Sequence, residues 1–89
     1  MIGGFIMTKI ERKWTKIAKN ILLGRKITSI RYVNRKEADA FMWYKRPVAL
    51  HLDNGVWVFP SQDDEGNDGG ALFTTDEKQE CLPVLDLND

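Results

Sequence analysis

Apolar residues recur at helical spacing near the start of the chain, in the segment "TKIERKWTKIAKNILLG" (residues 8–24). Lysine and arginine occupy most of the positions between them, which is typical of an amphipathic helix. Thr8, followed three residues later by Glu11, has the pattern of a capping box, and Gly24 is a typical helix end. The pattern therefore predicts a basic amphipathic helix over residues 8–23. Its apolar stripe consists of Ile10, Trp14, Ile17 and Ile21.

After this segment the apolar pattern changes to short runs typical of strands. "KITSIRYV" (residues 26–33) is rich in β-branched and aromatic residues and predicts a strand. Asn34, with Glu37 three residues later, predicts the start of a second, shorter helix through "RKEADAFMWY". Pro47 prevents that helix from continuing, because the residue before proline disfavours helical geometry.

The segment "VALHLDNGVWVF" has the pattern of a β-hairpin. Asn54 and Gly55 tolerate positive φ angles, so they predict a type I′ turn between strands at 48–53 and 56–60. "ALFT" and "CLPVL" predict two further short strands, and Pro83 indicates that the last lies at a sheet edge.

These elements together predict an α+β fold. We expect a small twisted antiparallel sheet of about four or five strands, with a long N-terminal amphipathic helix and a short second helix on it. A small, partly open barrel of SH3-like type is the alternative. The length of 89 residues predicts a single domain over residues 1–89. It would comprise a flexible N-terminus (1–7), the basic helix (8–23) and a sheet-rich core (24–89) with an acidic loop at 61–70.

Charge is divided between the two halves of the chain, although its net value is zero. Residues 1–46 hold twelve Lys or Arg and three Asp or Glu, which gives +9, whereas residues 47–89 hold one Lys and ten Asp or Glu, which gives −9. Such a division indicates either a charged partner or two halves that face each other. We favour neutralisation within or between chains over a basic ligand-binding face.

The acidic loop raises the question of a cation site. An EF-hand needs oxygen ligands at positions 1, 3, 5 and 12 and glycine at position 6. A loop that starts at Asp64 has Gly66 at position 3, and one that starts at Asp63 lacks the glycine, so neither register fits. A solvated turn is the favoured interpretation. A looser calcium or magnesium site, or a small-ligand pocket, is the alternative, with the candidate ligands Asp63, Asp64, Glu65 and Asp68.

The sequence offers few residues for other chemistry. One cysteine, Cys81, and one histidine, His51, exclude a disulfide framework, a cysteine-rich zinc site and a histidine cage within one chain. No activating motif surrounds either residue, so we predict no catalytic residue and no cofactor. No apolar run approaches the roughly 20 residues of a membrane span, and "MIGGFIM" does not have the pattern of a signal peptide. We therefore expect a cytoplasmic protein.

A second candidate surface lies in "FMWYKRP" (residues 41–47). Aromatic rings beside cations are typical of proteins that hold single-stranded nucleic acid, but the same composition is found where side chains pack on a sheet. The candidate residues are Trp43, Tyr44, Lys45 and Arg46. The cations of the N-terminal helix would add phosphate attraction, and they equally suit an anionic membrane surface. These cations are Lys9, Arg12, Lys13, Lys16 and Lys19.

Four stretches together resemble a family of small bacterial proteins of uncharacterised function. They are "GRKITSIRY", "WYKRPVALHLDNG", "FPSQDDEGNDGGALF" and "LPVL", and they span about residues 24–85. The resemblance implies a compact soluble fold and implies no activity, cofactor or catalytic residue. Residues 1–23 lie outside it.

The leading functional hypothesis is a non-enzymatic interaction module that self-associates through the apolar stripe of the N-terminal helix. The partner would be a second copy or another protein. Nucleic-acid binding through the basic helix and the 43–46 segment is the first alternative, and a divalent-cation or small-ligand site in the acidic loop is the second.

Overall fold

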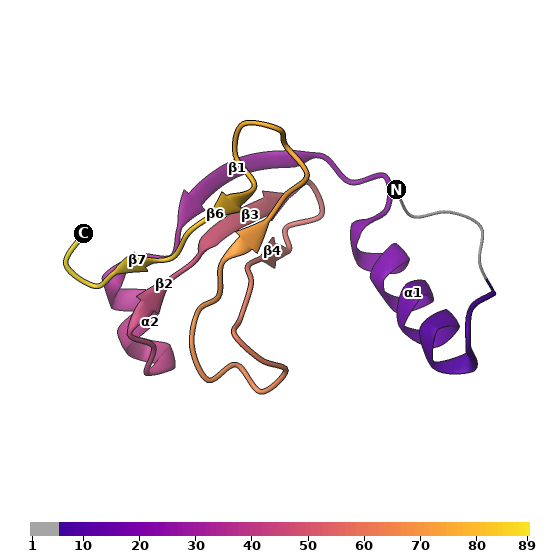
Figure 1. Cartoon of the computed structure of the whole chain (residues 1–89), viewed down its shortest axis with the longest axis horizontal. Coiled ribbons are helices and arrows are strands. Elements are labelled where there is room, and N and C mark those ends of the chain that lie inside the picture. The colour runs from indigo at the N-terminus through magenta and orange to yellow at the C-terminus, as the bar shows by residue number, and fades with distance from the viewer. Residues whose placement is uncertain (1–5) are drawn as a thin grey trace.

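The computed structural model describes residues 6–89, and residues 1–5 of the expected flexible N-terminus lie outside the described part. Two helices and seven short strands follow one another along these described residues, and the α+β class is confirmed. All strand pairs are antiparallel, and the described residues form no closed barrel. Figure 1 shows helix α1 (Lys9–Leu22) at one end of the molecule and helix α2 (Arg35–Phe41) at the other.

Helix α1 begins as its sequence predicts. The Thr8 hydroxyl accepts from the Glu11 amide at 3.1 Å, and the Glu11 carboxylate accepts from the Thr8 amide at 3.5 Å. These bonds satisfy amides that the first helical turn leaves free. The helix ends at Leu22, and Gly24 then adopts a φ of 73°, a left-handed angle that glycine tolerates without a steric penalty.

The main sheet has the order β1-β3-β4 and contains strands β1 (Ile27–Tyr32), β3 (Val48–Leu52) and β4 (Trp57–Val58). Tyr32 pairs with Val48, and His51 pairs with Trp57. The β3–β4 turn differs from the predicted type I′ turn, because Asn54 does not have a positive φ. Instead the Gly55 amide bonds to the Leu52 carbonyl at 3.0 Å and Gly55 has a φ of 84°, as in a three-residue loop that ends in a bulge.

Two small ladders complete the sheet-rich part. Strand β2 (Lys45–Arg46) pairs with β7 (Leu85–Asp86), and β5 (Leu72–Phe73) pairs with β6 (Cys81–Leu82). The Tyr32 hydroxyl donates to the Pro83 carbonyl at 2.8 Å and so connects β1 to the segment between β6 and β7. The predicted strand regions are therefore present, but "CLPVL" is divided into β6 and β7, β2 was not predicted, and the strands form three ladders in place of one sheet.

Helix α2 also begins with a capping box, between Asn34 and Glu37. It is shorter than predicted, because Met42 adopts a left-handed φ of 61° and ends the helix after Phe41. This turn directs Trp43, which is 5 % exposed, into the core. The core cluster consists of Val33, Ala38, Trp43 and Ala49, with Phe59 and Leu87 packed against it.

Candidate functional site

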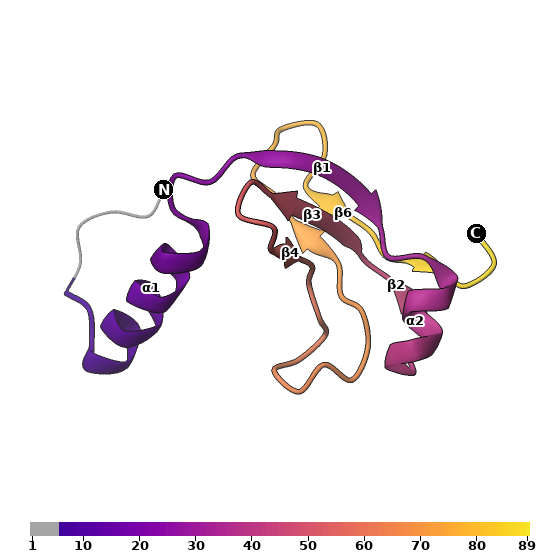
Figure 2. The same ribbon diagram turned by 180° about the vertical axis from the view of Figure 1, so that it is seen from behind.

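Helix α1 contributes no buried residue to this core. Figures 1 and 2, which view the molecule from opposite sides, both show it set apart from the sheet. The side chains of the predicted stripe are exposed by 71 % (Ile10), 59 % (Trp14), 36 % (Ile17) and 41 % (Ile21). The Asn54 side-chain amide donates to the Ile21 carbonyl at 3.2 Å, at the C-terminal end of the helix. The stripe is therefore partly covered near Ile17 and Ile21 and open near Ile10 and Trp14.

The cations of α1 are not neutralised within the described part of the chain. The ion pairs between residues 6 and 89 are Arg25–Asp53, Arg31–Glu37 and Arg35–Asp39, and none includes a residue of α1. The Lys13 ammonium instead lies 5.3 Å from the centre of the Trp14 ring, a cation–π contact. The acidic residues of the described chain therefore form no ion pair with the cations of α1.

An apolar groove of about 460 Å³ separates α1 from β4. Ala18, Ile21 and Leu22 form its helix wall, and residues 56–59 form its sheet wall. Val56 and Trp57 are 37 % and 36 % exposed. An exposed apolar surface on both walls is what an interaction site requires, because burial of such surface drives association.

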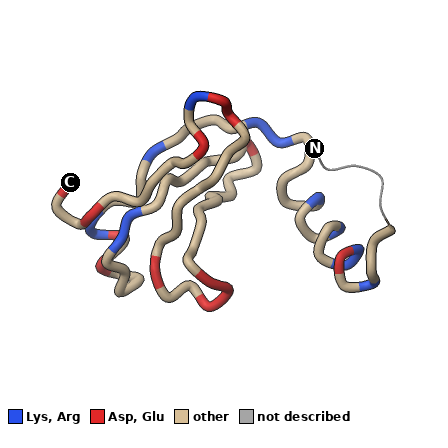
Figure 3. The backbone as a smooth tube through the Cα atoms, viewed as in Figure 1, with Lys and Arg blue, Asp and Glu red and all other residues tan. Residues whose placement is uncertain are grey.

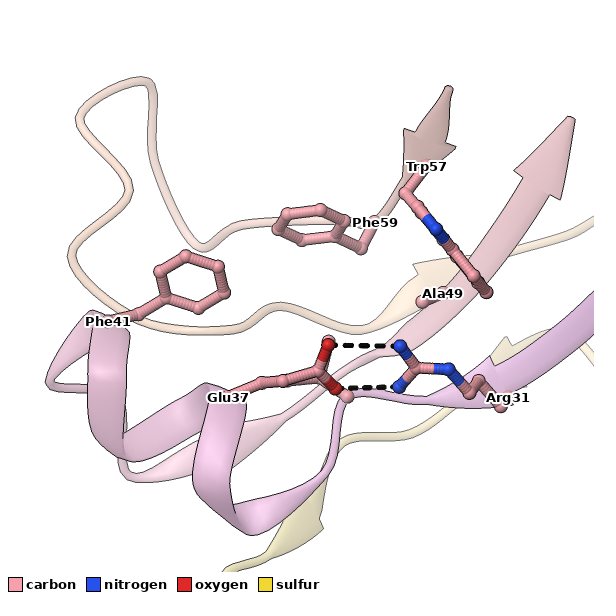
Figure 4. A pocket seen from close by; sticks show the side chains of 7 residues that line it. Arg31, Glu37, Phe41, Ala49, Trp57 and Phe59 are labelled. Carbon is pink, nitrogen blue, oxygen red and sulfur yellow. Dashed lines mark hydrogen bonds and ion pairs between the residues drawn. The ribbon is translucent and has the colours of Figure 1, made fainter. Parts of the chain in front are cut away.

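A second hollow, of about 200 Å³, lies on the other side of Trp57 and Phe59, between the sheet and α2. Figure 4 shows Phe41, Phe59, Trp57 and Ala49 around it, with Arg31 and Glu37 along one side. The Phe41 and Phe59 rings stack with centroids 6.0 Å apart. Trp57 and Phe59 line both hollows, so the groove and the pocket share a wall.

The charges beside this pocket neutralise each other. The Arg31 guanidinium donates to both carboxylate oxygens of Glu37, at 2.6 and 2.9 Å, and also lies 4.6 Å from the centre of the Trp57 ring. The hydrogen bond from Arg31, aided by the backbone amide of Asn34, lowers the pKa of Glu37 to about 2. Because both charges are engaged, the pocket suits an uncharged apolar group.

His51 belongs to the same face of the sheet. Its ring stacks on Trp57 with centroids 4.4 Å apart, and its Nδ1 lies 3.4 Å from the Thr28 hydroxyl. Cys81, the other residue considered for catalysis, is half-buried and pairs with Phe73 in the β5–β6 ladder. The two residues therefore belong to different ladders, and each acts as a packing residue.

The predicted nucleic-acid patch is not a continuous surface. Trp43 is in the core, and its indole N–H donates to the Gly66 carbonyl at 2.7 Å, so its ring cannot stack on a base. Arg46 donates to the carbonyls of Val33 and Asp89 at 2.8 Å each. Tyr44, which is 76 % exposed, and the exposed Lys45 remain at the surface. The packing interpretation accounts for Trp43 and Arg46.

The acidic loop is hydrogen-bonded to the backbone of Tyr44 and Lys45. One oxygen of Asp68 accepts from the backbone amides of Tyr44, Lys45 and Gly69 at 3.2, 3.0 and 2.8 Å. Gly69 itself passes so close to Pro47 that a Cβ atom there would lie 2.6 Å from the proline ring. The loop is thus held against β2, and Asp68 is a structural residue.

The other candidate ligands do not form a cation site with it. Asp63 accepts from the backbone amides of Glu65 and Asn67 and from the Asn67 side chain, and that side-chain bond lowers the pKa of the Asp63 carboxyl. Asp64 and Glu65 are exposed. Over residues 6–89, no three Asp, Glu, His or Cys side chains gather closely enough to hold a metal ion. The hydrogen bonds of Asp63 are those of an Asx-type turn.

Of the residues that line the groove and the pocket, the sequence pointed to Ile21 in the helix stripe but not to those of the sheet wall or the pocket. Trp57 and Phe59 are visible there only as an apolar run after a turn, and Arg31 only as a cation in a strand. Alternate residues of a strand point to the same face of a sheet, so the sequence indicates that such residues share a face. It does not show whether that face is open or buried.

Within residues 6–89, no helix has the length and apolar character needed to cross a membrane. Comparisons with protein-family models, with curated proteins and with solved structures found no match. The resemblance to small bacterial proteins over residues 24–85 accordingly stays a prediction, and the groove between α1 and β4, with the adjoining aromatic pocket, is the candidate site on physical grounds.

Proposed function

We propose that this chain is a small non-enzymatic interaction module that self-associates through the apolar stripe of α1. The observation that carries the proposal is the exposure of that stripe in the described chain, with Ile10 and Trp14 more than half exposed. A helix of 14 residues is marginally stable in water unless an apolar face is packed. Self-association would supply that packing.

The charge distribution supports a second copy as the partner. A chain with +9 in one half and −9 in the other is complementary to itself, and the cations of α1 have no ion-pair partner within residues 6–89. Figure 3 shows acidic residues in the loop at 61–70 and basic residues along α1. An association of two chains can bring these opposite charges together, which favours encounter and sets the register of the complex.

An anionic polymer or membrane is a poorer partner. The same acidic residues that attract another copy of α1 would repel phosphate groups. The nucleic-acid alternative also loses two of its proposed contacts, because Trp43 is buried and Arg46 bonds to carbonyl oxygens of its own chain.

The experiment is a measurement of molar mass by light scattering over a range of protein concentrations at moderate salt. We expect a dimer or larger species that dissociates on dilution. Ile17→Lys places a charge in the stripe and should shift the chain to monomer. Asn20→Lys is the matched control, because it adds the same charge at an exposed helix position outside the stripe and should leave association unchanged.

A wild-type chain that stays monomeric at every concentration would overturn the proposal. Equal behaviour of the two lysine variants would overturn the role of the stripe even if the chain associates. Circular dichroism of both variants checks that a lost assembly is not a lost fold.

A further inference from the structure

The groove between α1 and β4 has the shape and chemistry of an acceptor for a helix. We propose that α1 of a second copy docks in this groove, against residues 56–59, so that two chains bury their stripes reciprocally. This inference rests on the proposed self-association and names the surface that receives the helix.

Open apolar surface faces the groove from both of its walls. The sheet wall offers Val56 and Trp57, each exposed by more than a third, and the helix wall offers the exposed Leu22 and the partly covered Ile21. The free half of the stripe, with Ile10 and Trp14, stays more than half exposed in the described residues 6–89. A second helix in the groove would give a partner to the exposed surface on each chain.

The charges of α1 favour an acceptor that includes the sheet-rich part of the partner. Helix α1 carries five Lys or Arg and a single acid, Glu11, so two such helices packed only against each other would bring like charges together. The sheet-rich part offers the opposite sign. In Figures 1 and 2 the loop at 61–70, which holds Asp63, Asp64 and Glu65, lies along the lower edge of the molecule, as does the start of α1. An acceptor that includes the sheet therefore suits the basic helix better than a second α1 alone.

The wall that the groove shares with the pocket is aromatic, because Trp57 and Phe59 line both. Large aromatic side chains are the common anchors of interfaces, and they pack well against other rings. Trp14 is the aromatic residue of the stripe, and it is the side chain that we expect to reach this wall.

The proposed arrangement has two-fold symmetry. With that symmetry α1 of each chain lies in the groove of the other, and the complex closes as a dimer. Residues 23–26, which include Gly24 with its left-handed φ, link α1 to β1 in each chain.

The test is cross-linking between two different single-cysteine chains, in a background in which Cys81 is replaced by alanine. One chain carries Lys13→Cys, an exposed position next to Trp14 that leaves the stripe intact, and the other carries Val56→Cys or Val58→Cys, both on the sheet wall. The chains are mixed at the concentration where the Cys81→Ala parent is dimeric and treated with a short bis-maleimide. Because each chain has one cysteine, every cross-linked product joins two copies.

We expect the mixed 13–56 or 13–58 product to dominate over the 13–13 product, and mass spectrometry identifies which cysteines are joined. A control chain with Lys36→Cys, an exposed position on α2, should give little product with position 13. Dominance of the 13–13 product would show that the two helices pack against each other and would overturn the groove as acceptor, while the proposed self-association would stand. A parent chain that is monomeric would overturn the proposed function as well, so the two failures are distinguishable.

Discussion

Arg31 and Glu37 join strand β1 to helix α2 through two parallel hydrogen bonds of 2.6 and 2.9 Å. The same Glu37 carboxylate accepts from the amide of Asn34 at 3.0 Å, so one side chain both caps the helix and holds it to the sheet. This pair also forms the polar side of the aromatic pocket in Figure 4.

The first prediction concerns the pH dependence of this pair. The pKa of Glu37 falls from 4.5 to about 2 in the folded chain, so its ionised form stabilises the fold above pH 4.5. That contribution should disappear as the pH falls from 4.5 towards 2. Urea unfolding of the wild type and of Glu37→Gln should therefore differ at pH 7 and converge near pH 2.

A double-mutant cycle with Arg31→Gln isolates the pair. Both side chains are about two-fifths exposed, at 42 % and 39 %, so solvent screens the interaction. We expect a coupling free energy of about 0.5–1 kcal/mol at pH 7. A coupling that persists unchanged at pH 2 would contradict the assignment of the low pKa to Arg31.

The second prediction concerns Asp68. Asp68→Ala removes the acceptor of three backbone amides and should lower the free energy of unfolding by about 1–3 kcal/mol. Asp68→Asn retains a side-chain oxygen and should lower the free energy of unfolding by less than Asp68→Ala does. Asp64→Ala is the control, since Asp64 is exposed in the same loop. Chemical unfolding followed by circular dichroism measures all three, and an equal cost for Asp64→Ala and Asp68→Ala would count against the structural role of Asp68.

The third prediction separates two adjacent aromatic residues. Trp43→Ala creates a cavity in the core and should cost about 3–5 kcal/mol, whereas Tyr44→Ala at the surface should cost within about 0.5 kcal/mol. Thermal or chemical unfolding measures the free energy of unfolding of both variants. Similar costs for the two variants would mean that the ring of Trp43 is not buried.

Local chemistry explains which parts of the fold were predictable. Both capping boxes, Thr8 with Glu11 and Asn34 with Glu37, form as expected, because each depends on residues three positions apart. The sequence did not predict that α2 ends at Phe41. A left-handed φ, such as that of Met42, is unfavourable for a residue with a side chain. The burial of Trp43, the next residue, stabilises this turn, and local sequence does not reveal that burial.

The candidate site was less predictable, since it depends on contacts between distant segments. The stripe of α1 was identified from its spacing, but spacing does not say whether a stripe is covered. Arg31 and Trp57 meet across the sheet through strand order, and no local motif marks either residue. Tertiary packing likewise decides which side chains of "WYKR" are buried, and the local sequence does not show it.

The fourth prediction concerns the stability of α1 itself. At low protein concentration its amides should exchange with solvent much faster than those of β3, which is hydrogen-bonded to a strand on each side. A helix of this length without a buried face opens frequently, because few tertiary contacts hold it.

Raising the protein concentration should slow exchange in α1 selectively, because docking on a second copy would bury its stripe. Helix α2 is the internal control: its Ala38 is fully buried in the core of its own chain, so its exchange should not depend on concentration. Hydrogen exchange read by mass spectrometry at two concentrations gives both results. If α1 is as protected as β3 in the most dilute sample, its own chain must cover the stripe, and the reason for a second copy is lost.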